Sequence, residues 1–108
     1  MKRIAEEMKL ISRLQDWFGA ECNGDWEHSY GFRLETLDNP GWTFEADLTE
    51  TRWADLEIAR QRLDRTESDW VQFEVSQGKY IACGGTFNLA EMLQRFFDVL
   101  DELEATSQ

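Results

Sequence analysis

The chain has 108 residues, 42% of them hydrophobic and 13% aromatic, which predicts one domain over residues 1–108 with an aromatic core and a frayed end at 104–108. Its 11 basic and 22 acidic residues give a formal net charge of −11, which argues against nucleic acid or anionic membranes as partners. This charge either attracts a basic protein or serves only solubility. Two cysteines, a charged N-terminus and the lack of a span-length apolar window predict a reduced, cytoplasmic protein.

The first predicted element is an amphipathic helix. Its apolar residues recur at three- and four-residue spacing, which is the period of one helix face. Gly19 is a candidate stop signal, although the helix can continue to Cys22. The apolar stripe consists of Ile4, Met8, Ile11, Leu14 and Phe18.

An extended region with a period of two residues follows, at 30–35 and again at 42–48. The segment Asn39-Pro40-Gly41-Trp42 between the two runs predicts a type II turn. Proline would fix φ at its second position, and glycine would accept a positive φ at its third. We therefore expect a hairpin with one apolar face and one acidic face.

Three further strands and a helix complete the expected elements. The strands are predicted at 56–63, 70–76 and 79–83, with turns between them. Gly84 and Gly85 end the last strand. Asn88 is a suitable N-cap, with Glu91 three residues later, for a helix whose apolar stripe begins at Leu89.

Short connections between five consecutive strands imply an antiparallel meander, because parallel neighbours need long crossovers. Both helices must bury their stripes, so we place the N- and C-terminal helices on the one apolar face of the sheet, which gives a two-layer α+β domain. The opposite face is expected to be open and mostly acidic, and to carry Arg33, Glu35, Glu45, Asp47, Trp70, Gln72 and Glu74.

No group of residues in the sequence predicts a reaction, and we expect no catalytic residue, cofactor or metal ion. His28 is the single histidine, whereas a metal site needs three or four converging ligands. Nothing cationic follows Cys83 to stabilise a thiolate, so we interpret it as a strand-end cysteine packed under the final helix. The alternative is a small hydrolase or sulfurtransferase-like enzyme that uses Cys83 or His28.

Two turns each contain a tryptophan flanked by acids, NGDWEHSYG at 23–31 and ETLDNPGW at 35–42. From about residue 17 to 97 the chain resembles the immunity protein 53 family, small cytosolic proteins of bacterial polymorphic toxin systems. The resemblance implies a non-catalytic protein that binds a cognate toxin domain and neutralises it. It rests on these two turns and on the pairs Asp47-Leu48, Asp69-Trp70, Gly84-Gly85 and Asn88-Leu89.

The acidity is concentrated near the two tryptophan turns, since residues 21–50 hold eight acidic residues and one basic residue. We expect this surface to steer a basic, nuclease-like toxin toward a chain that is monomeric when free, with exposed indoles as anchors. For Trp26, a structural plug at the end of the first helix is the alternative. The expected partner-binding residues are Asp25, Trp26, Glu27, Glu35, Asp38, Glu45, Asp47, Glu50, Trp53 and Trp70.

Overall fold

A computed structural model describes the backbone of residues 2–106 and the side chains of residues 4–102. The chain divides into two compact units, residues 1–31 and 32–108, and each is described by itself. The single domain expected over 1–108 therefore stays a prediction. Of the predicted frayed end, residues 104–106 continue the last helix, and 107–108 lie outside the described residues.

The first unit contains the helix α1 (Lys2–Glu21) and the short helix α2 (Trp26–Ser29). Gly19 does not stop α1, and the Cys22 N–H still donates to the Phe18 carbonyl at 3.2 Å. Gly24, with a φ of 96°, then reverses the chain where a larger residue would be strained. The four-residue helix α2 was not predicted, since that segment was expected to be only a turn.

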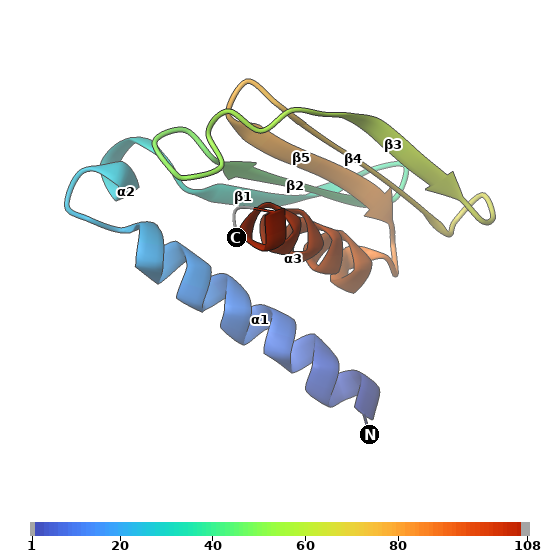
Figure 1. Cartoon of the computed structure of the whole chain (residues 1–108). Helices are drawn as coiled ribbons and strands as arrows, with labels where there is room; N and C mark the ends of the chain where they lie inside the picture. The colour runs from blue at the N-terminus through green and yellow to red at the C-terminus, as the bar shows by residue number, and fades with distance from the viewer. Residues whose placement is uncertain (1, 107–108) are drawn as a thin grey trace. The chain divides into compact units, whose positions relative to one another are not determined.

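The second unit is a five-stranded sheet with one long helix (Figure 1). All strand pairs are antiparallel, which confirms the α+β class. The elements, in chain order, are β1 (Phe32–Leu37), β2 (Gly41–Asp47), β3 (Ile58–Asp64), β4 (Trp70–Ser76), β5 (Lys79–Gly85) and α3 (Leu89–Thr106).

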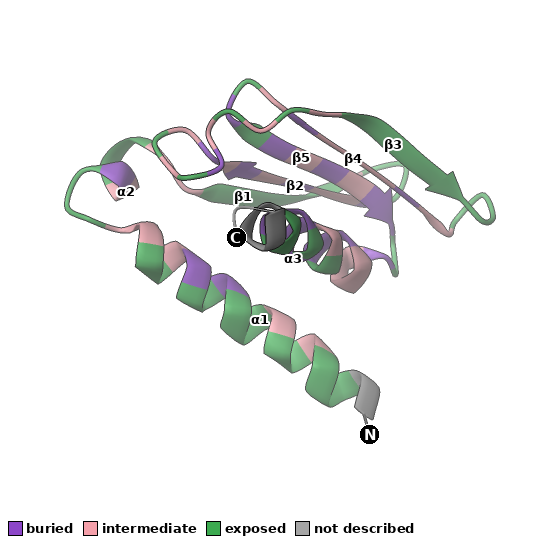
Figure 2. Cartoon of the chain, in the orientation of Figure 1, coloured by how far each residue is buried: buried purple, intermediate pink, exposed green. Residues whose placement is uncertain are grey.

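The predicted meander is wrong, because the strand order in the sheet is β1-β2-β5-β4-β3. Residues 48–57 connect β2 to β3 and carry the chain from one half of the sheet to its far edge. The polar strand β3 then lies at an edge, exposed along nearly its whole length, while the most buried strand, β5, occupies the centre (Figure 2). The order of the strands in the sheet is therefore set by the burial of apolar residues. The connection between β2 and β3 only has to be long enough to allow that order.

The core of this unit lies between α3 and one face of the sheet. The rings of Phe44, Tyr80 and Phe96 meet there, with centroids 5.0 to 6.0 Å apart. The Tyr80 hydroxyl donates to the Met92 carbonyl at 3.0 Å, so the one polar atom of this buried ring is paired. The predicted packing of α3 on the apolar face is confirmed, whereas that of α1 stays a prediction.

The predicted type II turn is also wrong. The Asn39–Pro40 peptide bond is cis, and Gly41 does not have the positive φ that a type II turn requires. Gly41 instead begins β2, where a Cβ atom would lie 2.3 Å from the Gly84 carbonyl oxygen. A close approach of two strands, and not a turn conformation, requires glycine at this position.

Candidate functional site

The first tryptophan turn forms the core of its own unit. Trp26 is 1% exposed, and its ring meets Trp17 edge to face at a centroid distance of 5.8 Å. The ring centroids of Phe18 and Tyr30 lie 6.0 and 6.2 Å from that of Trp26. This burial agrees with the alternative interpretation of Trp26 as a structural plug at the end of the first helix. The buried indole has no surface that a partner could contact.

Glu27 and Asn23 build the turn around Trp26. The Glu27 carboxylate accepts hydrogen bonds from the N–H groups of Asn23 and Gly24, both at 2.9 Å. Backbone donors, its own N–H first, lower the pKa of Glu27. The Asn23 Oδ1 accepts from the N–H groups of Asp25 and Trp26, each at 2.9 Å. Of this group, only Asp25 is left as an exposed acidic residue.

Trp53 is buried as well. It is 5% exposed, and its Nε1–H donates to the Leu100 carbonyl at 3.3 Å, so it ties the β2–β3 connection to α3. The guanidinium of Arg52 lies over the indole, 5.5 Å from the ring centroid. Trp53 thus stabilises the fold, and of the three tryptophans proposed as anchors only Trp70 keeps part of its ring at the surface.

The face of the sheet opposite α3 is not mostly acidic. Arg33 pairs with Glu35 at 3.5 Å and with Glu45 at 3.8 Å. The order β5-β4-β3 adds basic residues of β3 and β5 to this face, and Arg60 pairs there with Glu74 at 3.3 Å. These basic residues were not assigned to a face from the sequence. They neutralise most of the predicted acidic surface.

The remaining predicted acids lie at opposite ends of the sheet. Asp38 lies in the β1–β2 turn, whereas Asp47 ends β2 and Glu50 follows it in the next connection. A seven-residue strand separates these ends by roughly 20 Å. The structure therefore does not bring the predicted carboxylates together into one patch.

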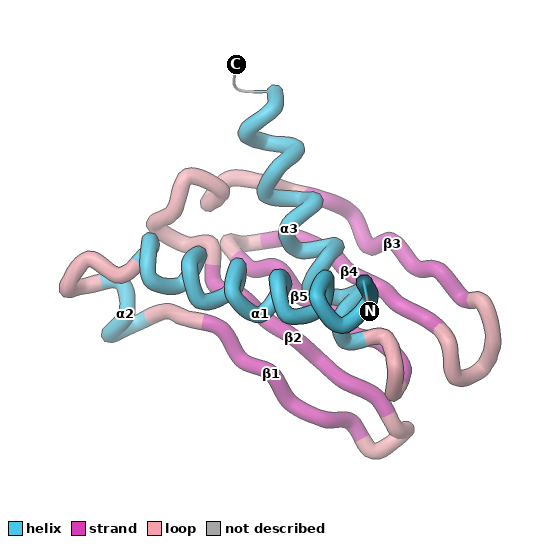
Figure 3. The backbone as a smooth tube through the Cα atoms, turned by 90° about the horizontal axis from the view of Figure 1, so that it is seen from below, coloured by secondary structure: helices cyan, strands magenta, loops and turns pink. Residues whose placement is uncertain are grey.

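A cavity of about 600 Å³ lies at the end of the sheet that holds Asp38. Three connections meet there, namely the β1–β2 turn, the β3–β4 loop and the β5–α3 loop (Figures 1 and 3). We call this cavity the turn-end groove. It is lined by Asn39, Pro40, Arg62, Glu67, Ser68, Trp70 and Thr86.

Arg62 and Trp70 form one wall of the turn-end groove. The guanidinium lies 4.8 Å from the indole centroid. It also donates to Asp64 at 2.9 Å and to Gln72 at 2.7 Å, so its charge is already compensated. Hydrogen bonding to Asp64 raises the pKa of Arg62. The wall is an aromatic surface beside an arginine whose charge is paired with Asp64.

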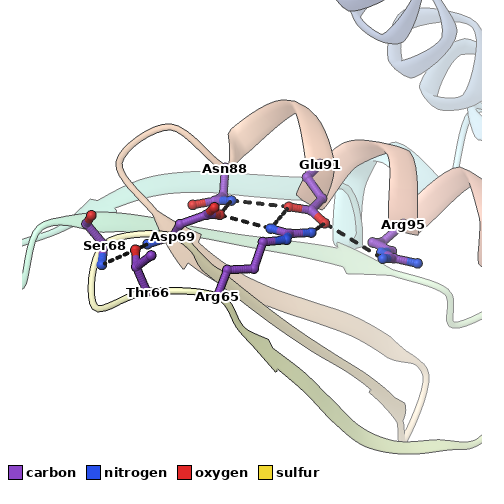
Figure 4. Close-up of polar contacts among 7 residues, drawn as sticks. All are labelled: Arg65, Thr66, Ser68, Asp69, Asn88, Glu91 and Arg95. Atoms are coloured by element: carbon purple, nitrogen blue, oxygen red, sulfur yellow. Dashed lines mark hydrogen bonds and ion pairs between the residues drawn. The ribbon is translucent and has the colours of Figure 1, made fainter.

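A polar network fixes the β3–β4 loop to the start of α3 (Figure 4). Arg65 donates to Asp69 at 2.9 Å and to Glu91 at 3.0 Å. The Asn88 amide donates to the same two carboxylates, at 2.9 and 3.1 Å. The pKa of Asp69 is lowered by Asn88 and then by Arg65, and that of Glu91 by Arg65 first. The network holds one lip of the groove against the helix.

Gly85 makes the close contact of this loop possible. A Cβ atom at position 85 would lie 2.2 Å from the Ser68 carbonyl oxygen and 2.8 Å from the Asn88 Oδ1. On the other side of the groove, the Trp42 Nε1–H donates to the Thr86 carbonyl at 2.8 Å. Hydrogen bonds and close packing therefore fix both lips of the groove, which favours a preformed site.

Phe87 is a residue of this region that the sequence analysis missed. It is 88% exposed, and it directly follows Thr86 of the groove lining. It also precedes the N-cap Asn88, where an apolar residue often packs on the helix as a hydrophobic staple. Exposure to this degree excludes that packing. The one signal for Phe87 in the sequence was that it is apolar but lies outside the apolar stripe of the following helix.

The structure places Cys83 differently from the prediction. Cys83 lies on the sheet face opposite α3, not under the helix as predicted, and its Sγ lies 3.6 Å from the Thr43 Oγ1. The prediction failed because strand alternation directs Ala82 and Gly84 toward α3. Partial desolvation and the nearby Glu27 and Glu21 raise the pKa of Cys22. The described residues contain no cluster of potential metal ligands.

The model of a family described as Immunity protein 53 matches residues 11–101. The chain belongs to the immunity protein 53 family. No curated protein and no solved structure matches it. Within residues 2–106, neither long helix combines the length and hydropathy needed to cross a membrane.

In this member of the immunity protein 53 family, the segments that carried the resemblance have different roles. Residues 23–31 form the tryptophan core of the first unit. The TLDNPGW turn, Asp69-Trp70, Gly84-Gly85 and Asn88 all lie at the end of the sheet that holds the turn-end groove. Asp47-Leu48 lies at the other end. Most of the distinctive segments of the second unit therefore build or support this groove.

Proposed function

We propose that this chain binds the toxin domain of a bacterial polymorphic toxin system in the cytoplasm and neutralises it without catalysis. The observation that carries the proposal is the family match over residues 11–101. The proposed partner is a basic protein domain, such as a nuclease, because a net charge of −11 favours encounter with a positive surface. Nucleic acid and membranes are not proposed as partners, and the free chain is proposed to be a monomer.

The exposed or half-exposed members of the predicted set support long-range steering. A rim carboxylate contributes mainly to the association rate and to its salt dependence. Trp26, Glu27 and Trp53 contribute indirectly, through the stability of the chain. The carboxylates proposed to steer the partner are Asp25, Glu35, Asp38, Glu45, Asp47 and Glu50, with Trp70 as the aromatic contact.

The test is calorimetry and stopped-flow association kinetics with the toxin domain encoded beside this gene, combined with an assay of the activity of that toxin. We expect one-to-one binding that abolishes the toxin activity. We also expect the association rate to fall by at least about tenfold when low salt is replaced by high salt, because screening removes electrostatic steering. Absence of binding would refute the proposal for this partner, and salt-independent association would refute the basic-partner part alone.

A further inference from the structure

We propose that the turn-end groove and Phe87 together form the surface on which the toxin docks. The occupant is a protruding, basic segment of that protein with an apolar tip. The inference rests on the proposed function and goes beyond it, because it assigns an interface and the chemistry of the segment that fills it. Four observations on the second unit carry it.

The first observation is an exposed aromatic residue with no role in the fold. Phe87 is 88% exposed, and it directly follows Thr86, which lines the cavity of about 600 Å³. Trp70 and Pro40 add aromatic and aliphatic surface to the lining of that cavity. Aromatic side chains such as Trp70 and Phe87 are typical of the few residues that supply most of the energy of a protein interface.

The second observation is that the groove is already held in shape. Asp69 binds Arg65 and Asn88 at 2.9 Å each, which joins the β3–β4 loop to α3. Within that loop the Thr66 Oγ1 accepts from the N–H groups of Ser68 and Asp69, at 3.3 and 3.0 Å. Binding of a partner therefore requires little loss of conformational entropy in the β3–β4 loop, because this loop is already ordered.

The third observation is the charge around the groove. In the described part of the chain, the carboxylates of Asp38 and Glu67 are exposed and make no ion pair. The one basic residue of the lining, Arg62, is paired with Asp64 at 2.9 Å. The uncompensated charge at the rim is therefore negative, and it complements lysine or arginine beside the apolar tip of the occupant.

The fourth observation is that charged residues at the two ends of the sheet lie far apart and can be changed independently. The open face between the two ends is neutralised by the pairs of Arg33 with Glu45 and of Arg60 with Glu74. Asp55, which follows β2, lies at the opposite end from the groove. A charge change at Asp55 and one at Glu67 therefore alter the net charge equally while changing the field at different places.

The experiment measures binding of the neighbouring toxin domain to the intact chain and to two pairs of variants. Phe87→Ala is matched with Met8→Ala, since Met8 is also exposed, at 64%. Glu67→Lys is matched with Asp55→Lys. We expect Phe87→Ala to weaken affinity at least about thirtyfold, the effect of a hot-spot residue. Glu67→Lys should slow association several-fold more than Asp55→Lys, and only at low salt. Met8→Ala should leave affinity within about twofold.

Hydrogen exchange of the wild-type complex supplies a second readout that needs no variant. We expect slower exchange at residues 66–70 and 86–88 when the toxin domain is bound. Wild-type binding with unchanged affinity in Phe87→Ala, or with protection confined to residues 48–56, would overturn the docking surface while the proposed function stood. Failure of the wild-type chain to bind would overturn both.

Discussion

Two tryptophans that follow an aspartate look alike in the sequence but have different roles. Trp26 is 1% exposed and touches Trp17 and Tyr30, whereas Trp70 lies at the surface under the guanidinium of Arg62. We expect Trp26→Ala to lower the free energy of unfolding by about 3–5 kcal/mol, because it leaves a cavity among aromatic rings. Trp70→Ala should cost only about 1 kcal/mol, the scale of an exposed cation–π contact.

Urea unfolding followed by circular dichroism measures both values. Under the proposed interface the order of the two variants reverses for binding, where Trp70→Ala has the larger effect. Equal losses of stability in the two variants would contradict the structural role of Trp26. A stable Trp26→Ala variant that no longer bound the toxin would instead return this residue to the interface.

The carboxylates of Asp69 and Glu91 make stability depend on pH in a definite direction. Both have a lowered pKa in the folded chain, caused by Asn88 and Arg65. A group of this kind stabilises the fold fully above its unfolded pKa of about 4, and the stabilisation is lost as the pH falls through the folded value. We therefore expect Glu91→Gln to be less stable than the wild type at pH 7, with the difference vanishing under strongly acidic conditions.

The measurement is the urea midpoint of both proteins between pH 7 and 2.5. Asp55→Asn serves as the control, since it removes a negative charge from an exposed loop outside the network. A difference between wild type and Glu91→Gln that stayed constant with pH would contradict an electrostatic role for the network.

At the scale of an element, the end of β5 is fixed by the loop that crosses it. Gly85→Ala would place a methyl group 2.2 Å from the Ser68 carbonyl oxygen, and backbone cannot easily move away. We expect it to destabilise the second unit by about 1–3 kcal/mol, as overpacking does. Gly19→Ala is the matched change, because a Cβ there meets nothing within 4 Å and lies inside α1. It should stabilise the chain by about 1 kcal/mol.

Thermal unfolding of the two variants checks these opposite signs. An unchanged melting temperature in Gly85→Ala would mean that the β3–β4 loop moves away without cost. That result would also weaken the case for a preformed groove.

The elements were largely predictable, but their order was not. Period-two and helical patterns depend on local side-chain alternation, so they placed all five strands and both long helices. β5 lies between β2 and β4 because it buries more of its residues than the other strands do. That comparison involves the whole sheet, so the local pattern of any one strand does not show it. The Gly41 turn was missed because the contact that requires glycine is made with Gly84, far along the chain.

The candidate site was predictable only in part, for the same reason. Trp70 was identified from the sequence, and it lines the turn-end groove. The burial of Trp53 depends on the Leu100 carbonyl, 47 residues away, which no local pattern shows. Phe87 was missed because a single apolar residue in a loop is ordinary in a sequence. It became a candidate only through its 88% exposure and its position directly after Thr86, which lines the cavity.

For the whole molecule, the net charge and the local distribution of charge have different consequences for binding. The value of −11 describes the field that a partner meets at a distance. Close to the sheet, Arg33 and Arg60 cancel much of that field on the open face. The acidic composition therefore favours a basic partner but does not show where the interface lies. The interface has to be inferred from the positions of the residues in the structure.

Whether residues 1–31 and 32–108 fold as one domain is a question of size. A segment of about 30 residues without disulfides is below the length at which chains usually fold alone. Its buried apolar residues include Leu14, Trp17 and Trp26, whereas Ile4 and Met8 are more than half exposed. We therefore expect a separate peptide 1–31 to be largely unfolded, and the intact chain to unfold in one cooperative transition.

The five tryptophan indole N–H signals in a ¹⁵N–¹H spectrum, assigned by Trp→Phe replacements, report on the two units separately. In a urea titration, the signals of Trp17 and Trp26 should disappear at the same midpoint as those of Trp42, Trp53 and Trp70, as two-state unfolding requires. Earlier loss of the first two signals would show that residues 1–31 unfold independently and would refute the single domain. Coincident midpoints would mean that stability lost through Trp26→Ala is lost by the sheet as well, so one unfolding curve would report on the whole chain.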